Sequence, residues 1–538
     1  MGSRPLASAC AEGGFDLAIF RSGSHGRPFV SGPPGGSALS TTKNNQSVSP
    51  ISRAGRYAAW ADRLAADTAA KWHIIVSTAF LAAAGIVWVA GMVELRFPGT
   101  LTGPFSYGRI RPIALLLAVI GWLTLSLAGG VYYILPRLTG VRMRGEALAL
   151  AGGVGTAGVT VVGALVVLLG GGDGTGPFSL PWWASLALLA TLSAPMVVTV
   201  STVRHRQEPN IYVSLWYALA GVVWLPLLYL VGAVPTLSAM GAAMSESVSL
   251  FGLSNLWVVG MGIGLAYYAL VKETGNPLAS RQLARVGFWS LAFASAWGGA
   301  GPLVFGPVPD WLEAVAFLMT LALPVSALAN AANLSLTTEE VWAERRDRPV
   351  VAAALAGAFF ALMTAALTSF GTVRSAAAVV GLTPFWDGVL YATLFGAGGL
   401  LVAAWSYQAL PSITGRTLAG PGLARLHLRL TFWGVGLTSA LLVGAGLVAG
   451  YGWAGGSFGG ISPTGEGWGD LVGMASLLLG LSILSGLIAL LGQFSFCLAV
   501  LRTFTSGRPA NQEVFTLVPA GGSSEGEEED SSETREEE

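Results

Sequence analysis

Histidine has the widest chemical range of any side chain in this sequence, because a neutral imidazole ligates metals and also transfers protons near neutral pH. The 538 residues contain only four histidines, which are His25, His73, His205 and His427. None of them lies in the middle of an apolar segment. The two cysteines, Cys10 and Cys497, stand far apart, one in a polar stretch and one in an apolar stretch. Neither a disulfide framework nor a cysteine metal site is therefore expected.

Motifs for soluble chemistry are missing from the sequence. It contains no Walker loop, no HExxH and no CxxC. The glycine-rich stretch GGVGTAGVTVVGA at 152–164 lies inside an apolar segment. Close helix packing explains it better than phosphate binding, because small residues let helix backbones approach in lipid.

The composition is that of an integral membrane protein. Hydrophobic residues make up 53% and charged residues 11% of the chain, where a soluble protein has about 25% charged residues. The formal net charge is zero, which gives no footprint for nucleic acid. The first partner that the composition implies is the lipid bilayer.

Twelve apolar segments each approach the roughly 20 residues that a helix needs to cross a bilayer. Long continuous apolar runs span membranes as helices, because a helix satisfies its own backbone. The sequence therefore predicts an all-α polytopic bundle of about twelve transmembrane helices. The predicted spans are 74–94, 113–135, 147–170, 182–202, 211–233, 248–271, 287–306, 311–334, 349–373, 387–410, 427–450 and 470–501.

Basic residues concentrate in every second loop between these spans. The basic loops lie near 137–144, 204–206, 272–285, 345–348 and 416–425, whereas the intervening loops carry only Arg96, Arg109, Arg111 and Arg374. Positive charge marks cytoplasmic loops. We therefore predict that both termini are cytoplasmic.

The two ends of the chain differ from the apolar middle. Residues 1–50 are rich in Gly, Ser and Pro and lack an apolar run of signal-peptide length, so a disordered segment is expected. Residues 506–538 end in an acidic block, for which a solvated, disordered tail is expected. The membrane domain is then residues 51–505.

Three groups of motifs resemble the catalytic subunit (subunit I) of the haem–copper oxidases, especially the C-family cbb-type cytochrome c oxidases and the related nitric oxide reductases. The first is SYGRIRPIALLLAVIGW at 106–122, followed by GGVYYILPRLTG at 129–140. It resembles the family's second helix, which contains roughly GRxRPxH. The resemblance implies that Ala114 stands where the family has a histidine ligand of the low-spin haem.

The second group ends in PDW at 309–311 and resembles the family's WAGPHHLHYTxLPDW. The resemblance places the two adjacent copper-binding histidines at Gly301 and Pro302, and a third nearby histidine at Val304. The family's cross-linked tyrosine falls on Ser295. The remaining copper histidine falls within 251–255, where this chain has none.

The third group, WDGVLYATLFGAGG at 386–399, resembles the family's TDWTIxHVHxGALGW. Its two haem-ligand histidines fall on Ala392 and Leu394, and a glutamate of the preceding helix falls on Phe370. One family histidine persists as His427, in LARLHLRLTFWGVG, but it is not a metal ligand in the family.

The family is an oxidoreductase family whose cofactors are haem b and copper. Haem iron needs an axial donor and copper needs imidazoles, whereas Ala, Leu, Gly and Pro donate nothing. We therefore predict no cofactor, no metal site and no catalytic residue. A missing haem would leave a costly void. We expect lipid or bulky side chains to fill it, the candidates being Trp257, Phe251, Phe370, Leu394 and Phe395.

Charged residues and histidines near the span ends have simpler interpretations than metal binding. His73 and His427 are expected to snorkel or to cap their helices. Arg109 and Arg111 are weak candidates for haem-propionate contacts; lipid phosphate, the Asp387 region or a partner subunit is favoured. Asp387 itself is interpreted as a helix cap.

Four buried polar residues, Asn330, Asn333, Ser254 and Asn255, are expected to form hydrogen bonds between helices.

Three functions remain open from the sequence. The first is a non-catalytic subunit I homologue that acts as a scaffold in a respiratory or nitrogen-oxide complex of a prokaryotic plasma membrane, with a cupredoxin-like or cytochrome c redox partner. The second is an active oxidase or nitric oxide reductase subunit with unconventional ligands. The third is a transporter that reuses the bundle, which the absence of charged residues from the span centres disfavours.

Overall fold

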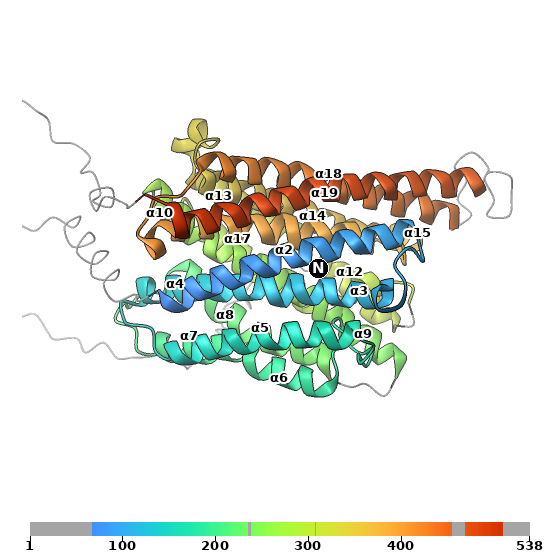
Figure 1. Cartoon of the computed structure of the whole chain (residues 1–538), viewed down its shortest axis with the longest axis horizontal. Helices are drawn as coiled ribbons and strands as arrows, with labels where there is room; N and C mark the ends of the chain where they lie inside the picture. The colour runs from blue at the N-terminus through green and yellow to red at the C-terminus, as the bar shows by residue number, and fades with distance from the viewer. Residues whose placement is uncertain (1–66, 235–237, 307, 454–467, 509–538) are drawn as a thin grey trace, which may run out of the picture. The chain divides into compact units, whose positions relative to one another are not determined.

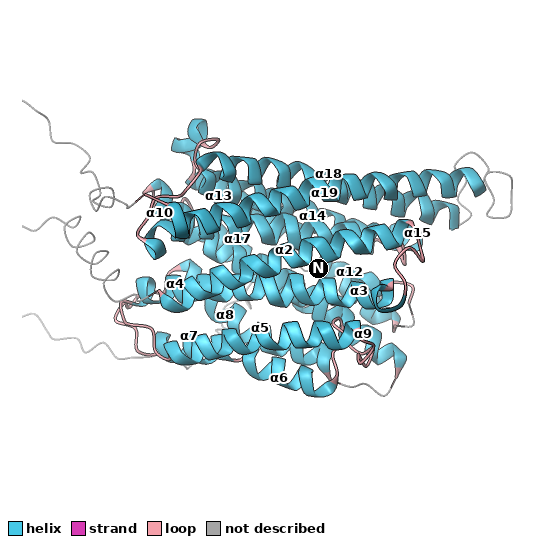
Figure 2. Ribbon diagram, in the orientation of Figure 1, coloured by secondary structure: helices cyan, strands magenta, loops and turns pink. Residues whose placement is uncertain are grey.

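The structure is a computed structural model that describes residues 67–234, 238–306, 308–453 and 468–508. The chain divides into the units Met1–Pro50 and Ile51–Glu538, and all described residues belong to the second. Every regular element within these ranges is a helix (Figures 1 and 2). The segment 1–50 and nearly all of the segment 506–538, for which disorder is predicted, lie outside the described residues.

Eleven helical stretches in the described ranges are long and apolar enough to cross a bilayer. They comprise α2 (Thr68–Arg96), α3 (Tyr107–Leu115) with η2 (Leu116–Thr124) and α4 (Leu125–Thr139), α5 (Glu146–Leu168), α6 (Trp182–Leu192) with α7 (Ala194–Val203), α8 (Val213–Ala233), α9 (Ala239–Gly252) with η3 (Leu253–Val259) and α10 (Gly260–Thr274), α12 (Asp310–Thr320) with α13 (Leu323–Thr337), α14 (Pro349–Thr372), α16 (Phe385–Tyr391) with η6 (Ala392–Gly398) and α17 (Gly399–Thr414), α18 (Pro421–Trp453) and α19 (Trp468–Ser506). The minor helices are η1 (Gly103–Phe105), η5 (Glu339–Glu344) and α15 (Arg374–Val380).

The remaining predicted span, 287–306, corresponds to α11 (Arg281–Trp297) followed by the 3-10 helix η4 (Gly298–Leu303). The helix α11 alone has 17 residues, fewer than the roughly 20 that a bilayer requires. Together with η4 it covers residues 287–303 of the predicted segment. The prediction of an all-α membrane bundle with about twelve spans is confirmed.

Three spans form the centre of the bundle. Tyr107–Thr139, Ala239–Thr274 and Phe385–Thr414 bury 100%, 83% and 94% of their apolar windows, whereas no other span buries more than 50%. Each of the three contains a π-helical segment, η2, η3 or η6, and these segments contact one another. Wide π turns inside α-helices occur frequently at functional sites, so the centre of the bundle is a candidate location for one.

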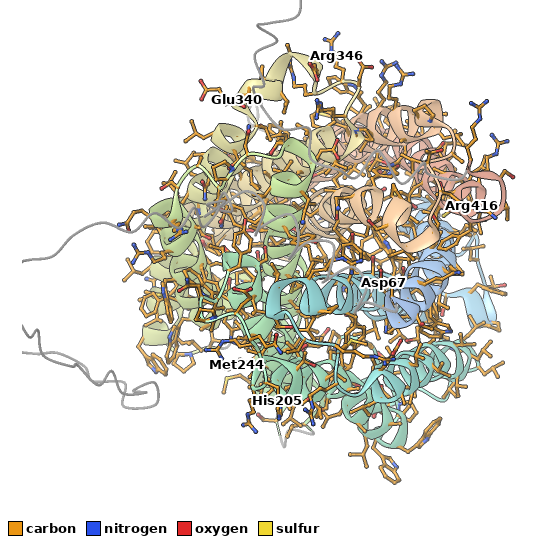
Figure 3. The ribbon with its side chains drawn as sticks, turned by 90° about the vertical axis from the view of Figure 1, so that its left-hand side faces the viewer. Asp67, His205, Met244, Glu340, Arg346 and Arg416 are labelled. Carbon is orange, nitrogen blue, oxygen red and sulfur yellow. The ribbon has the colours of Figure 1, made fainter. Side chains whose placement is uncertain are left out.

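The basic loops gather at one end of the bundle, here called the arginine-rich end, where α4, α7, α10 and α17 finish. Figure 3 looks onto this end, with His205, Arg346 and Arg416 labelled near its edge. There the guanidinium of Arg137 donates two hydrogen bonds of 2.8 Å to the carboxylate of Asp67, which ties the start of α2 to the end of α4. The assignment of this end to the cytoplasm stays a prediction.

The last two helices are the longest, with 33 residues in α18 and 39 in α19. They run side by side in Figure 1 and extend past the ends of the neighbouring helices. At about 1.5 Å per residue, each exceeds the roughly 30 Å of a hydrocarbon core. Both helices are therefore longer than the bilayer's hydrocarbon core is thick.

Candidate functional site

The positions that the resemblance assigns to haem ligands lie on two of the three central helices. Ala114 lies in α3, and Ala392 and Leu394 lie in η6; all three side chains are buried. Ala114 and Leu390, one turn before Leu394, line the same pocket, so the two helices meet near the positions that the resemblance assigns to the low-spin haem. Alkyl groups have no lone pair to give to iron. The two helices therefore meet as the resemblance implies, but the side chains at these three positions cannot bind iron.

Four aromatic rings occupy the space beside these positions; we call them the aromatic cluster. They are Trp88 of α2, Trp122 of η2, Tyr391 of α16 and Phe395 of η6. The ring of Phe395 lies at the centre of the cluster, with centroid distances of 5.3 Å to Trp88, 5.2 Å to Trp122 and 4.9 Å to Tyr391. These are ordinary packing distances for aromatic rings. The rings therefore pack against one another beside the positions that the resemblance assigns to haem ligands.

The side chain of Trp257 connects η3 to η2. Trp257 is fully buried, and its indole Nε1 donates a 2.9 Å hydrogen bond to Oγ1 of Thr124. Its six-membered ring packs over Gly221 of α8, where an added Cβ would lie 3.3 Å from the ring. The hydrogen bond satisfies the only polar atom of the indole in an apolar core. Trp257 thus fills the space between the second, fifth and sixth spans.

The positions that the resemblance assigns to copper ligands lie in and around η4. Gly301 packs against Thr372 of α14 and Thr320 of α12, whose hydroxyls lie 2.7 Å apart. Phe251, at the end of α9, packs on Gly298 of η4. The structure therefore brings 251–255 and 298–302 together, as a shared copper site requires. Within the described residues, no group of three or more His, Cys, Asp or Glu side chains is placed to hold a metal ion.

The space left at the centre is too small for haem. The pocket beside Ala114 has a volume of about 40 Å³, and a second cavity, which Phe395 also lines, has about 10 Å³. Sites for small organic ligands measure roughly 300–1,000 Å³. The lack of iron donors and the small pocket volume both mean that the residues of this chain do not fit haem b. The residues at the copper positions likewise do not fit copper.

Four of the five predicted filling residues are buried, and their occupation of the haem space stays a prediction. Trp257, Leu394 and Phe395 are fully buried, and Phe251 is nearly so. The prediction that Phe370 fills the core is wrong, because its side chain is 47% exposed on the outside of α14. Its ring lies 6.1 Å from that of Phe385, at the start of α16. The turn of α14 that faces inward carries Ser369 and Thr372 instead.

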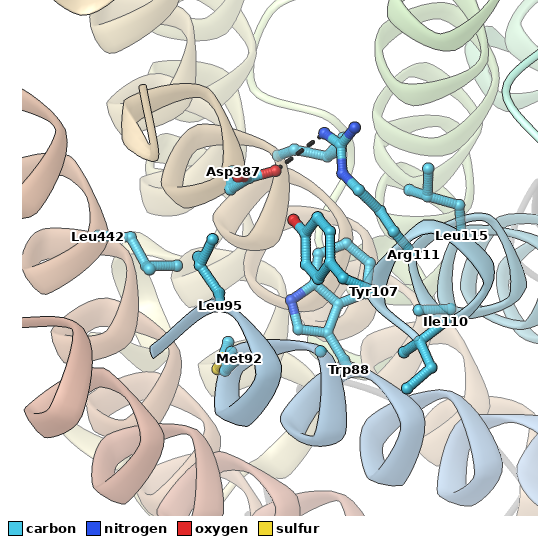
Figure 4. Close-up of a pocket in the computed structure, with 12 residues that line it drawn as sticks. Trp88, Met92, Leu95, Tyr107, Ile110, Arg111, Leu115, Asp387 and Leu442 are labelled. Atoms are coloured by element: carbon cyan, nitrogen blue, oxygen red, sulfur yellow. Dashed lines mark hydrogen bonds and ion pairs between the residues drawn. The ribbon is translucent and has the colours of Figure 1, made fainter. Parts of the chain in front are cut away.

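The pocket beside Ala114 opens at the end of the bundle opposite the arginine-rich end, and Figure 4 shows its lining. Nη2 of Arg111 donates a 2.9 Å hydrogen bond to Oδ1 of Asp387 across it, with the rings of Tyr107 and Trp88 below. The predicted contact of Arg111 with the Asp387 region is confirmed. Asp387 is not a helix cap, because α16 starts at Phe385 after Pro384, which puts the carboxylate in the first helical turn.

Arg109 points the other way from Arg111. Its Nη1 donates a 3.1 Å hydrogen bond to the carbonyl of Leu168 at the end of α5, and its guanidinium lies over Gly170. A cation at a helix C-terminus is favourable because the last carbonyls carry partial negative charge. Arg109 therefore closes the end of α5 and takes no part in the pocket.

The two histidines nearest the core are buried, which corrects the expectation that they snorkel or cap. Nδ1 of His73 donates a 2.7 Å hydrogen bond to the carbonyl of Ala69, and the ring packs edge-on against Trp72 and Tyr132. The hydroxyl of Tyr407 lies 2.8 Å from Nδ1 of His427. The physical reason is that α2 and α18 begin earlier than the apolar runs, at Thr68 and Pro421, which places each histidine more than a turn inside its helix.

A buried polar network joins four spans away from the haem positions. Oδ1 of Asn330 in α13 accepts hydrogen bonds from the hydroxyls of Tyr217 at 3.0 Å and Tyr267 at 2.7 Å. Asn333, one turn later, donates to the Tyr267 hydroxyl at 3.3 Å and to the carbonyl of Ser280 at 2.9 Å. The predicted interhelical role of the two asparagines is therefore confirmed.

The same prediction is wrong for Ser254 and Asn255. Both donate to carbonyls of their own helix, Ser254 to Leu250 and Asn255 to Phe251. A hydroxyl or amide that finds a carbonyl one turn back needs no partner on another helix.

Comparisons with known proteins agree with this geometry. The family described as "Cytochrome C and Quinol oxidase polypeptide I" matches residues 68–490. The chain belongs to this family, and the predicted resemblance to haem–copper oxidase subunit I is confirmed.

The individual relatives have low sequence identity to this chain, but they align with most of its length. The chain is 25% identical over 401 residues to cytochrome c oxidase subunit 1 of Rhodobacter capsulatus, covering 70% of this chain and 75% of the relative. It is 22% identical over 410 residues to the cbb3-type cytochrome c oxidase subunit CcoN1 of Stutzerimonas stutzeri, covering 72% and 86%. A solved haem–copper terminal oxidase dimer has the same fold, with a TM-score of 0.67 at 15% identity over 82% of this chain and 85% of that one.

Sequence reasoning missed two features of the site. The aromatic cluster includes Trp88, which no motif marks, and Tyr391, whose role the motif at 386–399 does not indicate. Tyr391 and Phe395 are four residues apart, which puts them on one face of the helix and was the available signal. The π segments carry no sequence signal that separates them from ordinary apolar helix.

Proposed function

We propose that this chain is a haem- and copper-free homologue of oxidase subunit I, which serves as a non-catalytic structural subunit of a respiratory or nitrogen-oxide electron-transfer complex. One observation carries the proposal. The positions that the resemblance assigns to metal ligands hold Ala114, Ala392, Leu394, Gly301 and Pro302, and packed aromatic side chains take the neighbouring space.

The packing matters because loss of ligands alone does not decide the question. A chain that had only lost its donors would keep an open cavity, and a cavity costs about 24 cal/mol per Å³. Here Phe395 contacts three other rings, and Trp257 has its own hydrogen bond. These contacts give the core a stable state without a cofactor, which supports a folded, ligand-free protein.

The structural role follows from what the bundle retains. Its helices hold an oxidase-like arrangement over most of the chain, so its surfaces can place other membrane subunits as an oxidase subunit would. The partner is a redox subunit of the cupredoxin or cytochrome c class, which would carry the electrons that this chain does not. The membrane is the plasma membrane of a prokaryote, as for the bacterial relatives.

The test uses the full chain purified from its native membranes with its partners. We expect a cytochrome c or cupredoxin-like subunit in the preparation, and we expect the chain separated from that subunit to lack a haem absorbance band. A stoichiometric haem band on the separated chain would overturn the proposal in favour of an oxidase with unconventional ligands. A haem-free chain that purifies without any redox subunit would overturn the scaffold role and favour a transporter.

A further inference from the structure

The ends of α2, α18 and α19 carry a group of cationic side chains at the arginine-rich end, here called the basic patch. Its members are Lys71 in the first turn of α2, Arg416 and Arg425 around the start of α18, and Arg502 and Arg508 around the end of α19. Nζ of Lys71 lies 5.6 Å from the ring centroid of Phe504, and Nη1 of Arg416 donates a 3.0 Å hydrogen bond to the carbonyl of the same residue. Figure 3 labels Arg416 near the edge of this end. The three helices therefore bring cations to one part of the surface.

The loop between α17 and α18 is fastened to the end of the described chain. The backbone N–H of Thr417 donates a 2.9 Å hydrogen bond to the carbonyl of Arg508, and that of Ala419 donates a 3.1 Å hydrogen bond to Oγ1 of Thr503. The sequence that follows Arg508 therefore continues from a point inside the basic patch.

Carboxylates are scarce around the basic patch. The segments 68–80, 411–430 and 490–508 contain no Asp or Glu. Arg425 forms a 3.4 Å ion pair with Asp347. Lys71, Arg502 and Arg508 are exposed, and none of them forms an ion pair with another of the described residues. A surface with an excess of one charge attracts the opposite charge, so the patch calls for an anionic occupant.

The sequence after Arg508 supplies such an anion. Residues 525–538, here called the acidic segment, contain nine Asp and Glu residues and one basic residue, Arg535. Glu525 follows Arg508 by 17 residues, and a chain of that length spans at most about 60 Å. The acidic segment can therefore reach a patch that begins at Arg508 itself. Covalent attachment also gives it a higher effective concentration there than a free partner has.

We propose that the acidic segment of this chain occupies the basic patch. Single ion pairs on a protein surface contribute little, but several on one tethered segment act together. The nine carboxylates outnumber the five cations of the patch, so each cation has a partner available. This occupancy replaces the solvated tail that the composition alone predicts. The inference does not rest on the proposed function.

Zero-length cross-linking with a carbodiimide, on the full chain in non-ionic detergent, tests the contact. The reagent joins a carboxylate to a lysine amine that touches it, and mass spectrometry of the monomeric chain maps the joined residues. Lys71 belongs to the patch, and Lys272, exposed in the last turn of α10 at the same end of the bundle, is the matched control. We expect the acidic segment to be joined to Lys71 about fivefold more often than to Lys272 at low salt, because charge and tether both favour the patch. Equal yields would overturn the proposal.

Salt gives a second readout on the unmodified chain. The Debye length is about 30 Å at 0.01 M salt and about 3 Å at 1 M salt. The yield of the Lys71 cross-link should therefore fall to that of Lys272 at the higher salt concentration. A Lys71 cross-link that persists there would mean that charge does not hold the segment, which contradicts the proposal.

Neutral substitutions separate the patch from the general charge of this end. Arg502→Gln with Arg508→Gln removes two cations of the patch and should lower the yield of the Lys71 cross-link about fivefold at low salt. Arg142→Gln with Arg144→Gln, in the exposed loop before α5, removes the same charge elsewhere at this end and should leave the yield unchanged. An equal decrease for both pairs would overturn the assignment to the patch.

Anionic lipid is the competing occupant, because basic residues at a membrane surface also attract acidic headgroups. The full chain is reconstituted in nanodiscs of phosphatidylcholine, with and without phosphatidylglycerol, and the Lys71 cross-link is measured in both. We expect the cross-link in both membranes, since the acidic segment is attached beside the patch. A cross-link that disappears with phosphatidylglycerol would show that headgroups occupy the patch in a membrane, and the proposal would fail.

Discussion

At the scale of single residues, apolar side chains stand at the positions where the resemblance places metal ligands, and aromatic rings pack beside them. Ala392 begins the π segment η6 and Leu394 is its third residue, and the next residue, Phe395, packs its ring against Trp88 and Trp122. Side chains one position apart point in different directions, so a ligand position and its filling residue can lie side by side in the sequence. The positions that lack a metal donor and the aromatic ring that packs beside them therefore belong to the same short segment.

The aromatic cluster should carry a large share of the core's stability. Phe395→Ala removes a buried ring with three aromatic neighbours and should lower the free energy of unfolding by about 3–5 kcal/mol. The matched control is Phe370→Ala on α14, where the ring is 47% exposed and the expected loss is below about 1 kcal/mol. Thermal unfolding of both variants in the same detergent is the measurement. Equal losses would show that the cluster is not a packed core.

Returning the histidines should not return the haem. Ala114→His with Leu394→His restores two imidazoles, but Phe395 and Trp122 still occupy the space and the pocket has only about 40 Å³. Haem absorbance of the purified double variant, expressed with added haem precursor, should stay at the level of the unmodified chain. A haem band with bis-histidine character would contradict the filled-site account.

At the scale of the elements, the network around Asn330 shows how the surrounding spans are held in register. One amide oxygen accepts from tyrosines of α8 and α10, and Asn333 extends the network to Ser280 before α11. Hydrogen bonds between helices restrict rotation about the helix axes, which apolar contacts alone leave freer. Glycines also lie at close contacts between these helices.

Removal of Asn330 should therefore cost more than removal of the partly buried amide Asn255. Asn330→Ala leaves the hydroxyls of Tyr217 and Tyr267 without their acceptor, and we expect a loss of about 1–3 kcal/mol. Asn255→Ala is the control, because that amide bonds only to a carbonyl of its own helix and its loss should be smaller. The comparison is made by thermal unfolding. A larger loss for Asn255→Ala would contradict the assignment.

The α18–α19 pair depends on a glycine at its closest approach. A Cβ on Gly434 would lie 2.4 Å from the backbone nitrogen of Ala489, which cannot rotate away. Gly434→Ala should separate the helices and cost about 1–3 kcal/mol. Gly158→Ala on α5 meets nothing within 4 Å and should be neutral or slightly stabilising, since alanine favours helix. The outcome against the account is an unchanged melting temperature for Gly434→Ala.

At the scale of the whole molecule, the spans were predictable because hydrophobic length is a direct consequence of bilayer thickness. The order of motifs also identified the family. The side-chain filling was only partly predictable, because an apolar run does not say which face turns inward. Phe370 faces outward on α14 for that reason. His73 and His427 are buried because helices began before the apolar runs did. The π segments depend on tertiary packing and leave no periodic signal.

The cofactor content of the chain tests the central claim most directly. The full chain is purified, separated from any redox subunit, and analysed for haem by pyridine haemochrome absorbance and for copper by elemental analysis. The account predicts far less than one haem and one copper per chain, because Ala114, Ala392, Leu394, Gly301 and Pro302 supply no ligands and the aromatic cluster fills the space. Haem b and copper at about one or more per chain would contradict it.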